Sequence, residues 1–242
     1  MNIEISLEDL LKNGSHFGHN KKRWNPKMDK FIYGEKNGTH ILDLRKSLPL
    51  IENALKFAHE SSKNKKKFLF VSTKKQHSEI VENIAKETNN YFVNFRWLGG
   101  MITNWNTVKN SINTLNNYEN ILNTEDTVFT KKELSDIEKK KIRLDKTLGG
   151  IVEMKSTPDV IFIIDTNREH IAVLEAKKLG IPIIGIVDTN CDPDLIDYPI
   201  PANDDGVKSV QFILDNFKKV LVSGEDTTSV ESTTKNEKYG TN

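Results

Sequence analysis

The sequence Phe95-Arg96-Trp97-Leu98-Gly99-Gly100-Met101-Ile102-Thr103-Asn104, residues 95–104, decides the fold of this chain. It follows the apolar run 91–93, which is typical of a buried strand, and it precedes the longest helical pattern in the sequence. Its two adjacent glycines permit backbone conformations that a side chain would forbid. Arg96 and Trp97 place a cation beside an indole, a pair that can meet a phosphate and stack on a base. The alternative interpretation is that Trp97 packs in the core.

Apolar runs alternate with amphipathic helical patterns on both sides of this stretch. The runs typical of strands occupy residues 68–71, 91–93, 160–164, 182–187 and 198–200. Continuous apolar strands that alternate with helices form parallel sheets with both faces covered. The sequence therefore predicts an α/β fold with a doubly wound, mainly parallel sheet, Rossmann-like or flavodoxin-like.

A long helical stretch interrupts this alternation. Its apolar residues follow 4-3 spacing in two narrow seams, which Glu119 and Lys141 interrupt. Thr130 and Glu133 have the spacing of a capping box at the start of the second seam. The pattern predicts an antiparallel helical hairpin, a coiled-coil arm, inserted between two strands of the sheet.

The chain divides into three parts on this interpretation. Residues 1–100 and 156–222 form the α/β body, and residues 101–155 form the arm. Within the body, Asn37-Gly38 between two apolar runs predicts a β-hairpin. The tail, residues 223–242, is rich in Ser, Thr and acidic residues without apolar periodicity, so we expect it to be disordered.

Composition limits the function classes. The chain has 242 residues, a net charge of +1 and a pI of about 7.8, whereas nucleic-acid-binding domains usually have a pI above about 9. Any nucleic-acid interface must therefore rest on local clusters of charge. The single cysteine excludes an intrachain disulfide framework and fits a reducing compartment. The sequence has neither a secretory signal nor an apolar stretch of membrane length, so we expect a soluble intracellular protein with no membrane partner.

Basic residues lie beside aromatic ones in several predicted loops. The segment 21–27 contains four cations and one tryptophan, which are the ingredients of phosphate contact and base stacking. The alternative is a solvated loop with a buried tryptophan. The residues predicted to contact RNA are Lys21, Lys22, Arg23, Trp24, Asn25, Lys27, Lys74, Lys75, Arg96, Trp97, Asn104, Lys131, Lys132 and Arg143.

Aspartates gather at the predicted carboxyl edge of the sheet. Asp188, Asp204 and Asp205 lie on segments that a doubly wound fold brings together. We favour helix capping by Asn203 and Asp204 with Lys208 nearby. The sharper hypothesis is that these carboxylates hold a divalent ion, Mg²⁺ or Zn²⁺, or form an acidic patch for a protein partner. We otherwise expect no cofactor.

Catalytic motifs are missing from the sequence. No GxGxxG follows a strand, and GxxxxGK[ST] does not occur. Ser72 has no obvious base partner, Cys191 has no basic neighbour, and His16 and His19 lack a second ligand pair at zinc spacing. We therefore expect no enzyme and no small-molecule substrate. Two alternatives stay open: a metal-dependent nucleotide-binding enzyme that uses the acidic strand ends, and a free RNA-binding module.

Several motifs in a fixed order resemble one known family. They are HFGH at 16–19, RWNPKM at 23–28, FIYGEKNGTHILDL at 31–44, FVSTKKQ at 70–76, NFRWLGGMITN at 94–104, LGGI at 148–151, PDVIFIID at 158–165 and EAKKLGIPIIGIVDTNCDPDLIDYPIPANDD at 175–205. From about Ser6 to Leu221 the chain closely resembles the small-subunit ribosomal protein 2 family, of bacterial or organellar type.

The resemblance implies a function that periodicity alone does not reach. It implies a non-enzymatic protein on the solvent side of the small ribosomal subunit, between head and body, in contact with 16S-type rRNA and neighbouring small-subunit proteins. It also implies a role in recruiting ribosomal protein 1 for translation. The expected location is the cytoplasmic ribosome, or an organellar ribosome if the source is not bacterial.

Overall fold

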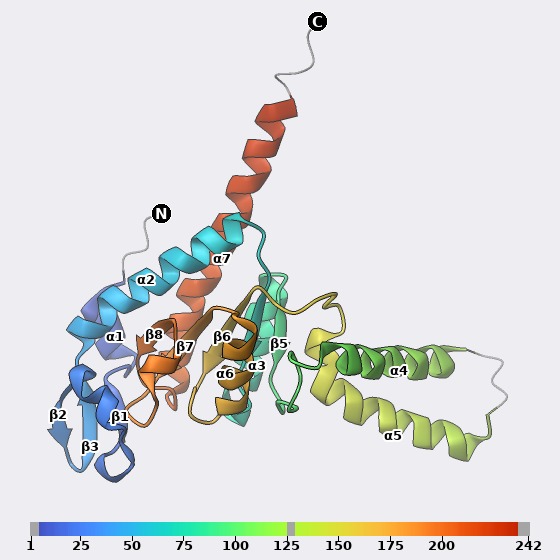
Figure 1. Cartoon of the computed structure of the whole chain (residues 1–242), viewed down its shortest axis with the longest axis horizontal. Coiled ribbons are helices and arrows are strands. Elements are labelled where there is room, and N and C mark those ends of the chain that lie inside the picture. Colours follow the sequence, from blue (N-terminus) through green and yellow to red (C-terminus); the bar gives the residue numbers. More distant parts are fainter. Residues whose placement is uncertain (1–4, 125–128, 237–242) are drawn as a thin grey trace, which may run out of the picture.

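A five-stranded parallel sheet lies at the centre of the chain (Figure 1). The computed structural model describes residues 5–124 and 129–236. The strands are β4 (Phe68–Val71), β5 (Tyr91–Val93), β6 (Val160–Ile164), β7 (Ile183–Val187) and β8 (Tyr198–Pro201). Their spatial order is β5-β4-β6-β7-β8 and every neighbouring pair is parallel. Counted along the sheet's own strands this is the flavodoxin-like order 2-1-3-4-5, so the predicted fold class is confirmed.

Helices cover both faces of this sheet. The main helices of the body are α2 (Leu44–Lys63), α3 (Ser78–Glu87), α6 (His170–Leu179) and α7 (Val207–Asn236). Side chains alternate across a strand. Phe68 and Phe70 therefore join the core under α2, α3 and α7, while Leu69 and Val71 join the core on the α6 side. Both faces are buried, which explains why the strands read as unbroken apolar runs.

A small antiparallel sheet adjoins the parallel one. It follows helix α1 (Leu7–Lys12) and has the order β1-β3-β2, with β1 (Phe17–Asn20), β2 (Ile32–Lys36) and β3 (Thr39–Leu42). Asn37 and Gly38 have φ of 53° and 77°, as a type I′ turn requires at both central positions. The predicted hairpin is present. The connections within the described residues contain five short 3₁₀ helices: η1 (Lys21–Arg23), η2 (Pro26–Phe31), η3 (Lys75–His77), η4 (Gly149–Ile151) and η5 (Pro193–Leu195).

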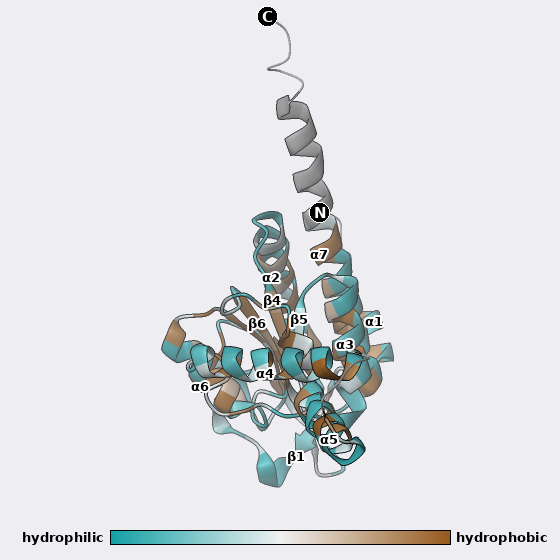
Figure 2. Cartoon of the chain, turned by 90° about the vertical axis from the view of Figure 1, so that its right-hand side faces the viewer, coloured by the Kyte–Doolittle hydropathy of each residue, from teal (hydrophilic) through white to brown (hydrophobic). Residues whose placement is uncertain are grey.

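Two long helices project from the β5 side of the body (Figure 1). They are α4 (Trp105–Asn123) and α5 (Lys131–Leu148), which lie side by side. Thr130 and Glu133 form the predicted capping box. The two residues that interrupt the apolar seams, Glu119 and Lys141, meet across the arm at 3.0 Å. In Figure 2, which views the molecule from the arm side, α4 runs across the view in front of the body, and α5 lies below it.

The end of the chain differs from expectation. Disorder was predicted from residue 223, but the helical backbone of α7 continues to Asn236. A helix anchored by its packed first turns adds one hydrogen bond for each further residue, and the segment 223–236 contains no proline to stop it. Residues 237–242 lie outside the described residues. Within the described part of the chain, none of the helices is both long and apolar enough to cross a membrane.

Candidate functional site

Lys74 lies just beyond β4, at the centre of a charged cluster on the carboxyl edge of the sheet. Its Nζ is 2.7 Å from Asp165 Oδ2, 2.9 Å from Asp204 Oδ1 and 2.7 Å from Asp205 Oδ1. The lysine side chain is only 13% exposed. Burial lowers the pKa of Lys74, but the three carboxylates outweigh burial and hold it above its ordinary value. The ammonium is therefore a built-in cation between the ends of β4 and β6.

His19 connects the small sheet to this cluster. Its Nδ1 is 3.0 Å from Asp188 Oδ2, and its Nε2 is 3.2 Å from Asp205 Oδ2. The hydrogen bond to Asp188 raises the pKa of His19 to about 9, although burial opposes this. His19 is consequently protonated at neutral pH and bridges two carboxylates. The three aspartates predicted to lie together do so, whereas the sequence pattern gave no indication that His19 is their neighbour.

Asp204 does not cap helix α7. Asn203 Oδ1 accepts hydrogen bonds from the backbone N–H groups of Asp205 and Gly206, at 3.0 and 2.9 Å. Asp204 instead accepts from Lys74, which replaces the predicted partner Lys208. Burial, together with the nearby Asp188 and Asp165 carboxylates, raises the pKa of Asp204 to about 7. Its Oδ2 is buried and has no hydrogen-bond partner among the described residues.

The cluster contains groups that suit a metal ion. One ligand atom each of His19, Asp204 and Asp205 lie within 4.8 Å of one another, as do those of Asp165, Cys191 and Asp204. Carboxylate oxygens suit Mg²⁺, and the added histidine or cysteine suits Zn²⁺. Binding has to compete with the Lys74 ammonium and with a proton on His19. The feature that favours a bound ion is the buried Asp204 Oδ2, which has no hydrogen-bond partner among the described residues. Metal binding at this cluster stays a prediction.

Two residues predicted to contact RNA have internal roles instead. The prediction for Lys74 is corrected, because its ammonium group is paired with three carboxylates. The prediction that Trp97 contacts RNA is corrected too, because this residue is 7% exposed and belongs to the apolar core with Met101 and Ile102. Its indole N–H donates to Glu175 Oε1 at 3.0 Å. The packing interpretation therefore fits Trp97 better than base stacking.

Glu175 of α6 holds the turn from Trp97 to Thr103 in place. Its carboxylate accepts hydrogen bonds from Trp97 Nε1 and from the backbone N–H groups of Gly100, Ile102 and Thr103, at 2.7–3.2 Å. The hydroxyl of Thr103 donates a fifth at 2.9 Å. Gly100 adopts φ +86°, a conformation that favours glycine. Burial pushes the pKa of Glu175 up, but these hydrogen bonds hold it below its usual value.

The other predicted RNA-contacting residues are mostly exposed, in three separate places. Lys21 pairs with Glu35 at 2.8 Å, and Lys27 pairs with Asp192 at 2.8 Å. The other exposed residues of this set are Lys22, Arg23, Lys75, Arg96, Asn104, Lys131, Lys132 and Arg143. Trp24 and Asn25 are half-buried, with the Trp24 ring 5.3 Å from that of His40. The small sheet and the arm lie at opposite ends of Figure 1, so these residues do not form one patch.

The nucleophile candidates are sealed inside the protein. Contrary to expectation, Ser72 does face a base, because its Oγ is 3.5 Å from His77 Nδ1. Both residues are 0% exposed, and burial lowers the pKa of His77 to about 4. Burial also raises the pKa of Cys191 to about 12. Neither group meets the requirement of an accessible, activated nucleophile.

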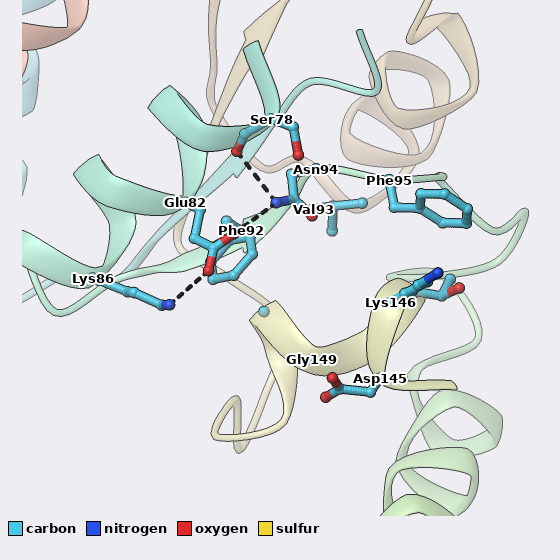
Figure 3. A pocket seen from close by; sticks show the side chains of 12 residues that line it. Ser78, Glu82, Lys86, Phe92, Val93, Asn94, Phe95, Asp145, Lys146 and Gly149 are labelled. Carbon is cyan, nitrogen blue, oxygen red and sulfur yellow. Dashed lines mark hydrogen bonds and ion pairs between the residues drawn. The ribbon is translucent and has the colours of Figure 1, made fainter. Parts of the chain in front are cut away.

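A hollow of about 470 Å³ lies between α3, β5 and the end of α5 (Figure 3). Its polar groups largely satisfy one another. Asn94 Nδ2 donates to Ser78 O and Glu82 Oε2, both at 3.2 Å, and Lys86 Nζ lies 2.6 Å from the other oxygen of Glu82. Paired charges of this kind stabilise the wall of the hollow rather than offering a ligand free donors.

Comparison with known proteins decides between the remaining alternatives. Residues 10–224 match the family described as Ribosomal protein S2. This chain belongs to the ribosomal protein S2 family. A relative from Wolbachia pipientis subsp. Culex pipiens, named small ribosomal subunit protein uS2, is 51% identical over 97% of this chain and 87% of its own length. The Brucella ovis protein of the same name is 49% identical over 91% and 87%. Membership in this ribosomal family makes the chain a structural, non-enzymatic protein of bacterial type.

Proposed function

We propose that this chain is a structural constituent of the bacterial small ribosomal subunit, located on cytoplasmic ribosomes, where it associates with rRNA and ribosomal proteins. The finer proposal is that it binds small-subunit rRNA between head and body and helps recruit ribosomal protein 1. Its near-neutral net charge suits a protein with two kinds of partner, provided that cations and carboxylates occupy separate surfaces.

Exposed unpaired cations carry the RNA part of the proposal. Lys22, Arg23 and Arg96 are exposed, and within the described residues none of them forms an ion pair. Free guanidinium and ammonium groups are the donors that phosphate oxygens require. Lys21 and Lys27, whose charges are already shared with carboxylates, are weaker candidates.

The exposed edge of the acidic cluster carries the protein part. The Asp205 side chain is 58% exposed, whereas that of Asp188 is 1% exposed and faces His19. Asp205 is thus the carboxylate that a partner can reach. A divalent ion, Mg²⁺ or Zn²⁺, at the same cluster remains a proposal that metal analysis of the purified protein tests directly.

Binding to small subunits that lack this protein tests the RNA contacts. We expect Arg23→Gln and Arg96→Gln each to reduce the slope of log affinity against log salt by about one unit. Lys178→Gln, an exposed cation of α6 outside the predicted interface, is the matched control. Unchanged occupancy and salt dependence in both arginine variants would contradict the proposed RNA contacts.

The acidic edge needs its own variant. Asp205→Asn removes the reachable charge while leaving the buried Asp188 in place, so we expect weaker binding of ribosomal protein 1 and near-normal attachment to the subunit. Pull-down of protein 1 on reconstituted subunits measures this. Lost subunit attachment with retained protein 1 binding would mean that the two surfaces are reversed.

A further inference from the structure

A second hollow, of about 460 Å³, opens at the point where the strand order of the sheet reverses. Its walls come from the segments that follow three strands: Thr73 after β4, Phe95 and Arg96 after β5, and Arg168 after β6. Ile171 of α6 completes the wall. In open α/β sheets, ligands bind outside the carboxyl ends of the strands at this switch point. The Lys74 ammonium fills the neighbouring part of the same edge, between β4 and β6.

Two buried glutamates hold the walls of this hollow in place. Glu169, which is 4% exposed, accepts hydrogen bonds from Thr73 N at 2.9 Å and from Thr73 Oγ1 at 2.5 Å. Glu175 fixes the other wall, since it binds the turn that directly follows Phe95 and Arg96. The hollow is therefore preorganised, and a ligand does not have to order its walls.

The exposed groups of the hollow combine an aromatic face with two cations. Phe95 is 57% exposed and Ile171 is 44% exposed, although both are large apolar residues. The Arg168 side chain is 55% exposed, and its Nε donates to Thr73 Oγ1 at 2.9 Å, which leaves the terminal nitrogens of the guanidinium to other acceptors. Arg96 is exposed and forms no ion pair with the described residues.

We propose that this hollow, the nucleotide pocket, holds one unstacked nucleotide of small-subunit RNA. The base stacks on Phe95 against Ile171, and the phosphate binds Arg96 and Arg168. Sequence-specific and loop RNA contacts commonly use an aromatic or guanidinium plane for such splayed bases. The proposal rests on the proposed function and adds Phe95, Arg168 and Ile171 to the predicted interface.

The charge of this pocket favours RNA over an apolar ligand. The same charge argument also favours this pocket over the hollow of Figure 3 as an RNA site. The Glu169 carboxylate that faces the pocket already accepts two hydrogen bonds from Thr73 and lies 3.9 Å from Arg168 Nε. Two guanidinium groups therefore meet one buried carboxylate, and the pocket retains a net positive charge. In the hollow of Figure 3, by contrast, Lys86 is neutralised by Glu82.

Equilibrium binding of the full chain to small subunits lacking it tests the pocket. We expect Phe95→Leu to weaken binding on the order of tenfold with an unchanged salt slope, because the apolar volume stays while the stacking face is lost. Arg168→Gln should lower the salt slope by about one unit. Leu174→Ala, which removes an equally exposed apolar side chain from α6, is the control and should bind like the wild type.

Photo-crosslinking identifies the occupant. With p-benzoylphenylalanine in place of Phe95, an adduct with RNA supports the nucleotide pocket, whereas an adduct with a ribosomal protein overturns it. If the wild-type chain fails to bind depleted subunits, the proposed function itself fails. If the wild type binds, and Phe95→Leu and Arg168→Gln bind equally well with the same salt slope, only the nucleotide pocket is refuted.

Discussion

His19 illustrates how a single residue joins two sheets through charge. It belongs to β1 of the small antiparallel sheet, yet both ring nitrogens face carboxylates on the edge of the parallel sheet, Asp188 and Asp205. The backbone N–H of His19 also donates to Thr189 Oγ1 at 2.9 Å. Removing the proton would leave one nitrogen facing a carboxylate oxygen without a hydrogen between them, so the contact depends on the charge state of the imidazole.

This dependence predicts a pH effect on stability. The pKa of His19 is raised from 6.5 to about 9 in the folded protein, so its contribution is fully present below pH 6.5 and is lost as the pH rises through about 9. Burial raises the pKa of Asp204 from 3.8 to about 7. Ionisation of Asp204 therefore also lowers the free energy of unfolding as the pH rises, but over the lower range that ends near pH 7. We expect the free energy of unfolding to fall between pH 6.5 and 9, and His19→Gln to flatten this fall.

Urea unfolding with a metal chelator present measures the effect without interference from an ion. His170→Gln, at an exposed position of α6 outside the cluster, should keep the wild-type decline. A His19→Gln variant that declines as steeply as the wild type over the same range would contradict the role assigned to the imidazolium.

At the scale of secondary structure, η4 is the element that packs against β5, the edge strand of the parallel sheet. It follows helix α5. Gly150 makes this approach possible, since a Cβ at that position would lie 2.2 Å from the carbonyl oxygen of Phe92. An exposed edge strand invites pairing with another chain. The base of the arm therefore also protects the sheet.

Gly150→Ala should separate η4 from β5. Because the clash is with backbone rather than with a flexible side chain, we expect a loss of at least about 1–3 kcal/mol in unfolding free energy, the usual cost of overpacking. Greater self-association should follow from the uncovered edge. Gly34→Ala is the control, because a Cβ there meets nothing within 4 Å. Denaturant unfolding and light scattering together measure both effects, and wild-type values for both would contradict this role of η4.

The sequence predicted those elements whose signals are local. Apolar runs located the parallel strands, Asn37-Gly38 located a hairpin turn, and Thr130 with Glu133 located the start of α5, because each signal spans only a few residues. Glu175 could not be recognised in this way. Its hydrogen-bond partners lie 72–78 residues away in the chain, and one glutamate among the residues of an amphipathic helix resembles any other.

The charged cluster at the carboxyl edge of the sheet was predicted only in part, because local signals located its aspartates but not their distant partner. The ends of the predicted strands indicate which aspartates lie close together. The lysine that balances their negative charge follows a different strand. Lys74 is 130 residues from Asp204, so its sequence neighbours indicated only a basic turn, and a phosphate contact was the natural interpretation. Exposure separates the two roles: the Lys74 side chain is 13% exposed, whereas its neighbour Lys75 is exposed.

At the scale of the whole molecule, the body and the arm differ in how much they bury. The strands of the sheet are buried on both faces, whereas the arm has a single seam between two helices. Ile112 and Leu115 are 4% and 3% exposed near the body, but Leu122 and Ile137 farther out are only half-buried. Midway along the arm the seam is held by an exposed ion pair, Glu119 with Lys141, which contributes at most about 1 kcal/mol.

This gradient predicts how the arm exchanges its amide hydrogens. In the free protein we expect protection to decrease from the Leu115 level outward, and to stay below that of β6 throughout the arm, because local opening costs less where little apolar area is buried. On the small subunit, contacts with RNA or protein should raise the protection of the outer turns. Hydrogen exchange followed by mass spectrometry measures both states, with β6 as the internal reference. Arm protection in the free protein equal to that of β6 would show that the seam is as stable as the sheet, and the arm would then be a rigid extension of the body rather than an element that its binding site orders.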